Sequence, residues 1–215
     1  MLQQVLTMLS MQDGMNTKVH PQWIEQQYAW HRAVWVECAE LMDHVGYKWW
    51  KKQVPDLEQI KLEIIDIWHF GMSALFEKSS TLESLAEQIT EAIQSVESSG
   101  AEAVSLHEAI DRVAETSLAS KGFSVPAFWQ LMQAADMSFD ELYVAYVGKN
   151  VLNFFRQDNG YKDGSYQKQW QGREDNEHLV ELVAELDTSD EQFRDKLYQA
   201  LQTRYAAVTS QAALA

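Results

Sequence analysis

Two pairs of acidic residues have a spacing that suits metal-ion chemistry. Glu37 and Glu40 form the first pair, and Glu63 and Asp66 form the second. A spacing of three residues places both members of a pair on one side of a helix, about one turn apart. Each pair can therefore direct two carboxylates toward the same point.

Both pairs lie in segments whose other residues form a mostly apolar helical pattern. Glu37 shares an apolar stripe in residues 30–42, and Glu63 shares one in residues 60–70. Such stripes face a protein core, where an uncompensated carboxylate is costly and neighbouring carboxylates repel one another. A divalent cation removes both problems, because oxygen ligands on facing helices bind Mg²⁺. The pattern predicts a Mg²⁺ site made by all four acids, and the alternative is two acidic pairs on solvated helix faces.

The composition favours helices. The chain has 215 residues, with only three prolines and nine glycines. We expect an all-α fold: one domain, residues 1–215, with a helical bundle core in which the two metal-binding helices face each other. Residues 79–120 are rich in acids and form two amphipathic helices split at Ser98-Ser-Gly100. We expect this segment to be a peripheral or mobile lobe that forms a smaller helical cap region.

Helix start and stop signals divide the rest of the chain. Pro21 suits a first helical turn, Gly46 suits a helix end, and Asp56 suits an N-cap position. Polar residues 12–18 indicate a break, and Gly and Asn indicate a loop at residues 158–166. We therefore expect helices at residues 2–10, from 21 to 45, from 57 onward, at 126–157 and at 175–208.

The charge distribution points to a small anionic ligand. A net charge of −15 speaks against nucleic acid or an anionic membrane as the main partner. The basic residues nevertheless concentrate at residues 48–52 and 149–173, an arrangement that suits a polyanion. The first residues lack the basic and apolar regions of a signal peptide, and no apolar run is long enough to span a membrane. We therefore expect a cytoplasmic protein, without a disulfide framework because Cys38 is its single cysteine.

Several sequence blocks, in this order, resemble the all-α dimeric dUTPase family, within the wider group of all-α nucleoside triphosphate pyrophosphohydrolases. The resemblance covers residues 10–72 and 140–180, whereas residues 79–120 match no motif and the Gln…Asn pattern near the N-terminus is looser than in the family. The blocks are Glu37-Cys-Ala-Glu40, Gly46-Tyr-Lys-Trp-Trp-Lys-Lys, Glu63-Ile-Ile-Asp66-Ile-Trp-His-Phe, and a last block from Gly148 to Asn176. In that last block Gly148-Lys-Asn-Val-Leu-Asn-Phe-Phe-Arg leads into Gly160-Tyr-Lys, and Glu174-Asp-Asn stands at the end.

The resemblance implies a hydrolase of nucleotide metabolism. It implies Mg²⁺-dependent hydrolysis of dUTP to dUMP and pyrophosphate, hydrolysis of dUDP as well, and a homodimer. This reaction keeps uracil out of DNA. Two or three Mg²⁺ ions would be held by Glu37, Glu40, Glu63 and Asp66. Either Glu37 or Glu40 would orient and deprotonate the attacking water, and the sequence does not choose between them.

The remaining site residues are predicted from the chemistry of the substrate. Lys149 and Arg156 lie seven residues apart, so both can project to one side of a helix toward phosphates. Uracil has two carbonyls and an N–H, which suit amide side chains and an indole N–H. The alternatives are solvated surface cations, a packing role for Trp49 and a hydrogen-bonded core histidine at position 69. The candidates for phosphate are Lys149, Arg156, Lys168 and Lys51, and those for base or sugar are Gln12, Asn16, Trp49, His69, Asn153 and Tyr161.

Two other functions remain open at the level of sequence. The acidic pairs also suit a nucleoside triphosphate pyrophosphohydrolase of broader specificity, acting on dCTP and dUTP or resembling MazG. A non-catalytic helical interaction protein that senses a nucleotide would keep the fold without the chemistry. Turnover of dUTP compared with dTTP, dCTP and UTP separates these possibilities.

Overall fold

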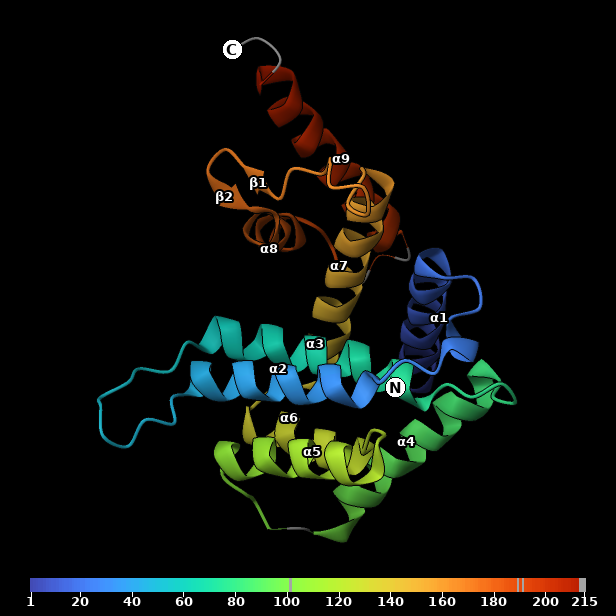
Figure 1. Cartoon of the computed structure of the whole chain (residues 1–215), viewed down its shortest axis with the longest axis vertical. Helices are drawn as coiled ribbons and strands as arrows, with labels where there is room; N and C mark the ends of the chain where they lie inside the picture. Colours follow the sequence, from blue (N-terminus) through green and yellow to red (C-terminus); the bar gives the residue numbers. More distant parts are fainter. Residues whose placement is uncertain (101, 189, 191, 213–215) are drawn as a thin grey trace. The chain divides into compact units, whose positions relative to one another are not determined.

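The computed structural model describes residues 1–100, 102–188, 190 and 192–212, and the described chain is almost entirely helical (Figure 1). The prediction of an all-α fold is confirmed, with one small hairpin added. None of the described helices is long and apolar enough to cross a membrane. The elements are α1 (Leu2–Val19), a 3₁₀ helix η1 (Trp23–Gln26), α2 (Trp30–Val45), α3 (Leu57–Leu75), α4 (Leu82–Ser99), α5 (Leu106–Ser120), α6 (Val125–Ala134), α7 (Phe139–Asp158), β1 (Gln169–Trp170), β2 (Arg173–Glu174), α8 (Asp175–Glu185) and α9 (Phe193–Ala212).

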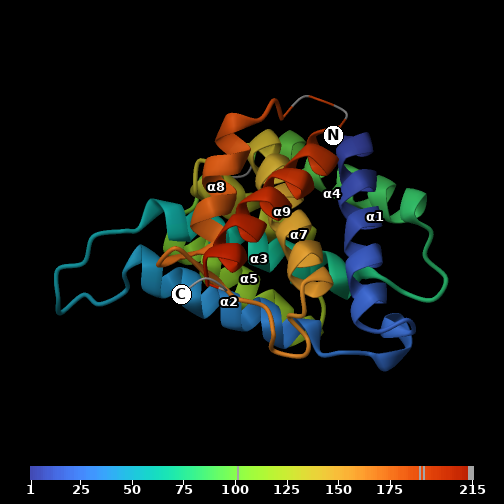
Figure 2. The ribbon, with the colours of Figure 1, turned by 90° about the horizontal axis from the view of Figure 1, so that it is seen from above.

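The chain forms two compact units, Met1–Tyr143 and Val144–Ala215. In the first unit α2 and α3 lie side by side as an antiparallel pair (Figure 1). The loop that joins them, residues 46–56, extends away from both helices in Figures 1 and 2. Helix α5 packs against α2 and α6, and α1 packs against α3 and α4. The α2–α3 pair therefore forms the centre of this unit.

An aromatic cluster fixes the packing of α6 against α3. The Trp68 ring stacks on Phe128 with a centroid distance of 4.9 Å, and Phe123 lies 6.0 Å from the same Trp68 ring. Gly71 makes this possible, because a Cβ at that position would lie 2.4 Å from the Phe123 ring. A glycine in α3 therefore admits the ring to the helix surface.

The second unit surrounds Phe155 with aromatic rings. Four ring centroids lie 5.4–6.2 Å from the centroid of the Phe155 ring, those of Tyr166, Trp170, Tyr198 and Tyr205. These residues come from the end of α7, the hairpin segment and α9, so one ring holds three parts of the unit together. Aromatic pairs of this geometry add to the stabilisation from burial alone.

The β1–β2 hairpin closes on a two-residue turn. Trp170 pairs with Arg173, and the intervening Gln171 and Gly172 have φ values of 51° and 81°. Positive φ at both central residues is typical of tight hairpins, because it matches the twist of the strands. The turn sends the chain back into α8.

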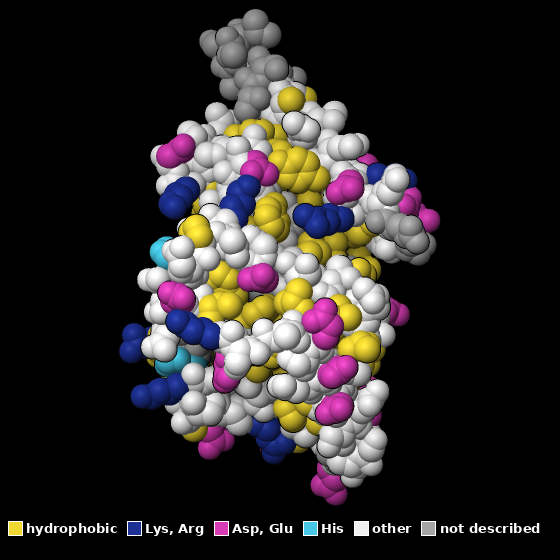
Figure 3. All heavy atoms as spheres, turned by 90° about the vertical axis from the view of Figure 1, so that its right-hand side faces the viewer, with side chains coloured by type: hydrophobic (Ala, Val, Ile, Leu, Met, Phe, Trp, Pro, Cys, Tyr) yellow, Lys and Arg dark blue, Asp and Glu magenta, His cyan; other side chains and the backbone are white. Residues whose placement is uncertain are grey.

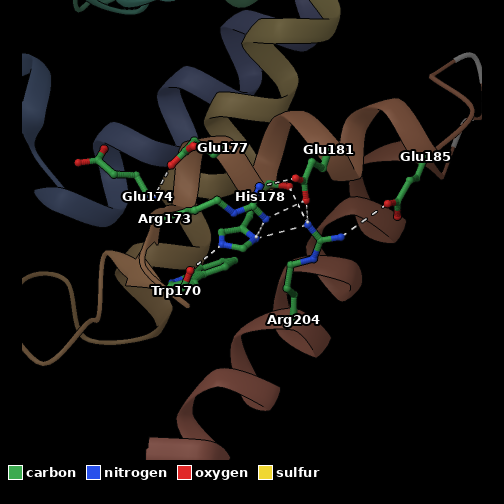
Figure 4. A network of polar contacts seen from close by, with 8 residues as sticks. All are labelled: Trp170, Arg173, Glu174, Glu177, His178, Glu181, Glu185 and Arg204. Atoms are coloured by element: carbon green, nitrogen blue, oxygen red, sulfur yellow. Dashed lines mark hydrogen bonds and ion pairs between the residues drawn. The ribbon is translucent and has the colours of Figure 1, made fainter.

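A polar network fastens the hairpin to α8 and α9 (Figure 4). His178 is buried, with Nε2 2.9 Å from the Trp170 carbonyl and Nδ1 facing Arg173 and Arg204 at 3.3 and 3.5 Å. Guanidinium groups only donate hydrogen bonds, so Nδ1 accepts and Nε2 carries the proton. Arg173 and Arg204 both also bond to Glu181. The network thus joins three elements of the second unit.

Several predicted helix boundaries were right. Helix α2 ends before Gly46, and the Asp56 side chain caps α3 by accepting a hydrogen bond from the Gln59 N–H. Gly100 ends α4 in a left-handed conformation with φ of 60°, as expected for the split between the two acidic helices. Both acidic helices contribute buried apolar residues to the first unit, and the mobility of residues 79–120 stays a prediction.

The predicted break after residue 10 is wrong, because α1 continues to Val19. Two of the polar residues that suggested a break are buried: Gln12 and Asn16 both donate hydrogen bonds to the Ser73 hydroxyl in α3. The start of α2 at residue 21 is also wrong, since the 3₁₀ helix ends at Gln27 with a left-handed φ of 49°. That conformation cannot continue a helix.

The two long helices predicted near the C-terminus are each divided in two. Helix α6 ends before Asp136, which has a φ of 51°, and Ser138 then starts α7 by accepting a hydrogen bond from the Glu141 N–H. Helix α8 ends at Glu185, because the backbone of the next residue, Leu186, is extended, and α9 begins at Phe193. Local capping and backbone conformation interrupt an apolar pattern that otherwise continues.

Candidate active site

Three of the four predicted metal ligands converge between α2 and α3. One ligand oxygen from each of Glu37, Glu63 and Asp66 lies within 4.8 Å of the others. Glu63 is buried, and the other two carboxylates are half-buried. Glu40 lies one turn along α2 and is exposed, yet its charge is close enough to raise the pKa of both Glu37 and Glu63. The facing helices therefore concentrate oxygen donors as a hard divalent cation requires.

The electrostatics of this acidic cluster favour bound protons or a cation. Burial, a hydrogen bond with Glu63 and the charge of Asp66 raise the pKa of Glu37 to about 8. Burial also raises the pKa of Glu63, although the hydrogen bond with Glu37 lowers it in part. The raised pKa favours the protonated form of Glu37 near neutral pH, in which Glu37 can donate a hydrogen bond to Glu63. A divalent cation would take the place of that proton, because it neutralises the same oxygens.

Two neighbours complete the surroundings of the acidic cluster. His44, at the end of α2, places Nε2 3.5 Å from the Glu63 carboxylate. Cys38 is buried beside Glu37, and burial together with the Glu37 charge raises the pKa of the thiol to about 12. The thiol therefore stays protonated near neutral pH and acts as a small packing residue.

A buried polar cluster joins α1 to α3. The Gln12 amide donates to Ser73 Oγ at 3.0 Å and to Asn16 Oδ1 at 3.2 Å, and Asn16 Nδ2 donates to the same hydroxyl at 2.9 Å. Gln12 Oε1 lies 2.9 Å from His69 Nδ1, so that nitrogen carries the proton. The structure thus brings together three predicted base contacts and adds Ser73. Its place one turn after His69 was the only sequence signal for it.

A cavity of about 630 Å³ adjoins this polar cluster. Ser73 lines it together with Trp23, Trp30 and Phe76. The charged groups of the lining are Lys78, Lys121 and the acid Glu77. The Trp23 ring meets the edge of Phe76 at 5.1 Å, which gives one wall a flat aromatic character. Cavities of this size with apolar walls and a few polar groups are typical of small-molecule sites.

The loop between α2 and α3 carries two further candidates into solvent. Trp49 is 91% exposed and meets only the edge of Trp50 among the ring contacts of the described residues, at 5.5 Å. Lys51 is also exposed. Neither side chain packs against the helices of the first unit. Packing within this unit therefore does not explain the tryptophan at position 49.

The second unit brings three predicted site residues together around one guanidinium. Arg156 Nη1 donates to Asn153 Oδ1 at 3.1 Å, and the guanidinium carbon lies 5.9 Å from the centroid of the Tyr161 ring. Arg156 also forms two hydrogen bonds to Asp175, a residue of the resembling block for which no role was predicted. The Glu-Asp-Asn run at positions 174–176 gave no periodic signal, because Asp175 is buried at the start of a helix rather than on an apolar stripe.

The other two predicted phosphate ligands of the second unit lie on either side of this group in the chain. Lys149 lies on α7, two turns before Arg156, and is half-buried. Lys168 precedes the hairpin and forms an exposed ion pair of 3.4 Å with Glu174. Exposed pairs of this kind are weak, so Lys168 can exchange this partner for a phosphate at little cost.

An all-helical chain with converging carboxylates on two facing helices defines a candidate metal-dependent hydrolase. The chain matches the dUTPase family over residues 4–161. This match spans well over half of the chain, so the protein belongs to the dUTPase family and is a dUTP diphosphatase. The matched segment contains the acidic cluster and the polar cluster, whereas Lys168 and Asp175 lie beyond it. A comparison with curated proteins found no match.

Proposed function

We propose that the protein hydrolyses dUTP to dUMP and pyrophosphate with the help of Mg²⁺ bound at the acidic cluster. The observation that carries this proposal is the convergence of Glu37, Glu63 and Asp66 within 4.8 Å. Two or three ions per site, hydrolysis of dUDP to dUMP and phosphate, and protection of DNA from uracil belong to the same proposal. Oxygen ligands of this number and charge suit Mg²⁺ better than softer metals.

The chemistry assigns separate tasks to the carboxylates. When bound, Mg²⁺ supplies charge neutralisation for the phosphate oxygens and favours ionisation of the attacking water. Glu37, Glu63 and Asp66 would hold the Mg²⁺ ions in place for the phosphate groups. Glu40 is the better candidate to accept the proton from water, because it is exposed and lies outside the three-carboxylate cluster. Glu37 remains the alternative base.

Recognition of uracil is assigned to the polar cluster and its cavity. Gln12, Asn16 and His69 are held together by the Ser73 hydroxyl, and Ser73 reaches the cavity wall. Uracil carries two acceptors and one donor on its edge, which an amide and a hydroxyl can match. The aromatic walls suit the faces of a flat base. Trp49, Asn153 and Tyr161 remain proposed contacts of base or sugar.

The outer phosphates are assigned to four cations. Lys149, Arg156 and Lys168 supply positive charge from the second unit, and Lys51 supplies it from the loop after α2. Arg156 is the strongest candidate, because a guanidinium offers several fixed donors to phosphate oxygens. A chain with a net charge of −15 needs local cations for a polyanionic substrate. The same net charge argues against nucleic acid as a partner and fits a cytoplasmic enzyme.

A homodimer completes the proposal. Several large hydrophobic side chains are exposed, including Trp35 at 47% and Val36 at 45% on α2. On the face drawn in Figure 3, hydrophobic side chains likewise reach the surface between scattered charged groups. Exposed apolar groups on one helix face favour association with another surface.

The decisive experiment is a substrate panel with purified protein and Mg²⁺. Release of pyrophosphate from dUTP should be far faster than from dTTP, dCTP or UTP, and Glu40→Gln should abolish it. Comparable turnover of all four nucleotides would replace this proposal with a pyrophosphohydrolase of broad specificity. Full activity of the Glu37→Gln and Asp66→Asn variants would exclude the acidic cluster as the catalytic centre and leave a non-catalytic role for it.

A further inference from the structure

We propose that Asp175 is a positioning residue that fixes the Arg156 guanidinium for the phosphate groups of the substrate, with Tyr166 as its support. The inference rests on the proposed role of Arg156 as a phosphate ligand. Asp175 lies beyond residues 4–161, which match the dUTPase family, and within the sequence block 140–180 that resembles it. It is joined to Arg156 inside the second unit. Its role follows from the geometry and burial of the pair.

The two side chains form a contact of two parallel-paired hydrogen bonds, from two guanidinium nitrogens to the two carboxylate oxygens. Arg156 Nε donates to Asp175 Oδ2 at 2.8 Å, and Arg156 Nη2 donates to Asp175 Oδ1 at 2.7 Å. The Tyr166 hydroxyl donates a third hydrogen bond to Oδ2 at 2.8 Å. The carboxylate thus accepts three strong bonds and has one orientation only.

Both charges are withdrawn from water. The Asp175 side chain is 0% exposed and that of Arg156 is 11% exposed. Burial of the guanidinium lowers its pKa, but the hydrogen bond and charge of Asp175 more than offset this and leave the pKa of Arg156 raised. A buried ion pair contributes little net stability compared with packed apolar residues. Net stability therefore does not explain a charged pair at this position, and the charge and its direction point to a role in binding.

The surroundings leave part of the guanidinium available in a defined direction. Among the contacts of the described residues, three of the five N–H groups of Arg156 are engaged: two by Asp175 and one by Asn153. Two N–H groups remain. The half-exposed Tyr161 ring lies 5.9 Å from the guanidinium carbon and restricts it further. A guanidinium held in this way loses less conformational entropy when it binds an oxyanion.

Asp175 also connects Arg156 to a second predicted phosphate ligand. Its backbone N–H donates to the Lys168 carbonyl at 3.0 Å. The residue thus lies where α8 begins, where the hairpin ends and where the guanidinium is oriented. Movement of this carboxylate would disturb Arg156 first and the Lys168 backbone second.

A kinetic double-mutant cycle tests the assignment on the full-length enzyme. Asp175→Asn should raise the KM for dUTP about tenfold or more while kcat falls less, because the second acceptor oxygen and the charge are lost. In the Arg156→Lys background the same substitution should change kcat/KM by less than about threefold, because an ammonium group cannot form the two paired hydrogen bonds that orient a guanidinium on the carboxylate. Inhibition by deoxyuridine, which has no phosphate, should be unchanged.

The outcomes separate this inference from the proposed function. If Arg156→Lys and Arg156→Ala leave kcat/KM for dUTP unchanged, Arg156 binds no phosphate. The proposed function of Arg156 is then wrong, and Asp175 has no phosphate ligand to position. If Arg156 variants are impaired but Asp175→Asn has no effect, or lowers kcat/KM by the same factor in both backgrounds, the positioning role is overturned. Equal weakening of dUTP and deoxyuridine binding would likewise indicate a merely structural residue.

Tyr166→Phe provides the same test with a milder change. It removes one hydrogen bond to Asp175 and keeps the ring, so it should raise the KM for dUTP severalfold in the wild-type background and not in Arg156→Lys. Tyr198→Phe is the matched control, because Tyr198 packs on the same Phe155 ring but bonds to Asp158 instead. An identical effect of both Tyr→Phe substitutions would contradict the proposal. If Asp175→Asn does not fold, Tyr166→Phe takes its place in the double-mutant cycle with Arg156→Lys, and Tyr198→Phe remains the control.

Discussion

At the scale of single residues, the carboxylates of the acidic cluster repel one another, and a bound proton or cation reduces this repulsion. The pKa of Glu37 lies at about 8 rather than the ordinary 4.5, because of burial, its hydrogen bond with Glu63 and the charge of Asp66. A folded state that holds a proton more tightly than the unfolded chain is stabilised at low pH. This contribution is complete below about pH 4.5 and is lost as the pH rises through 8.

We therefore predict opposite effects of Glu37→Gln without and with metal. In EDTA at pH 8 the variant should be more stable than the wild type by about 1–2 kcal/mol, after allowance for solvent screening, because a neutral amide ends the repulsion. Its stability should also vary less between pH 5 and pH 8. In Mg²⁺ the wild type should gain stability and the variant should not. Thermal unfolding measures both quantities.

The control for this prediction is Glu87→Gln, an exposed carboxylate on α4. It should leave the pH dependence and the effect of Mg²⁺ unchanged. A wild-type protein whose melting temperature rises between pH 5 and pH 8 in EDTA would contradict the assignment of a bound proton to the acidic cluster.

Ser73 gives a second prediction at the residue scale. Ser73→Ala removes the hydroxyl that accepts from both Gln12 and Asn16, so two buried N–H groups lose a partner. We expect a loss of about 1–3 kcal/mol in the free energy of unfolding. If the polar cluster binds the uracil base, the KM for dUTP should also rise. Urea unfolding and steady-state kinetics test the two effects separately, and Ser98→Ala, which removes only a bond to the Gln94 carbonyl, serves as control.

At the scale of elements, the sequence predicted helices well where one local signal controls an end. Asp56 and Gly100 act through their own capping or backbone conformation, so their effect is visible in a few residues. The continuation of α1 through Gln12 and Asn16 was missed because their hydrogen-bond partner Ser73 lies 57 or more positions away in the chain. The two-residue strands of the hairpin are too short to produce a periodic pattern.

Gly71 provides a test of element packing. Its replacement by alanine would place a Cβ 2.4 Å from the Phe123 ring, so the ring or α3 must move. We expect a loss of about 1–3 kcal/mol in the free energy of unfolding, as for other overpacked cores. Phe123→Leu should reduce the penalty of Gly71→Ala, because the two changes share one contact. The control is Gly122→Ala, whose Cβ would lie 3.5 Å from Ser120 Oγ, and an equal loss there would contradict this explanation.

The segment after α7 gives a prediction about ligand-dependent order. Its second half is fixed already, since the Gln167 N–H donates to the Tyr205 hydroxyl and Tyr166 bonds to Asp175. Residues 161–165 are exposed and are joined mainly to one another and to Gly160. We expect hydrogen exchange at residues 161–165 to slow when a non-hydrolysable dUTP analogue and Mg²⁺ bind, with little change at Gln167. Equal exchange with and without the ligand would exclude closure by this segment.

At the scale of the whole molecule, the candidate site could be predicted only in part. The acids of α2 and α3 were predictable because helical spacing places them on facing stripes of neighbouring helices. Ser73 and Asp175 were not, because their importance lies in contacts with Gln12 and Arg156 far away in the sequence. Sequence patterns identify groups that share one element, whereas a buried partner becomes visible only through packing.

The last prediction concerns association of two chains. Helix α2 exposes Trp35 and Val36, and these line a groove of about 400 Å³ together with Ala39 and the acids Glu40 and Asp43. Burial of such apolar area stabilises a complex, whereas a net charge of −15 on each chain opposes it.

We expect light scattering at micromolar concentration to give about twice the 24.7 kDa of one chain, with association stronger at higher salt because salt screens the repulsion. Trp35→Asp should weaken the dimer if this face takes part, whereas Trp49→Asp in the exposed loop is the comparison for a tryptophan elsewhere. A single-chain mass for the wild type at every salt concentration would refute the dimer. A Trp35→Asp protein that stays dimeric would place the contact away from this face of α2.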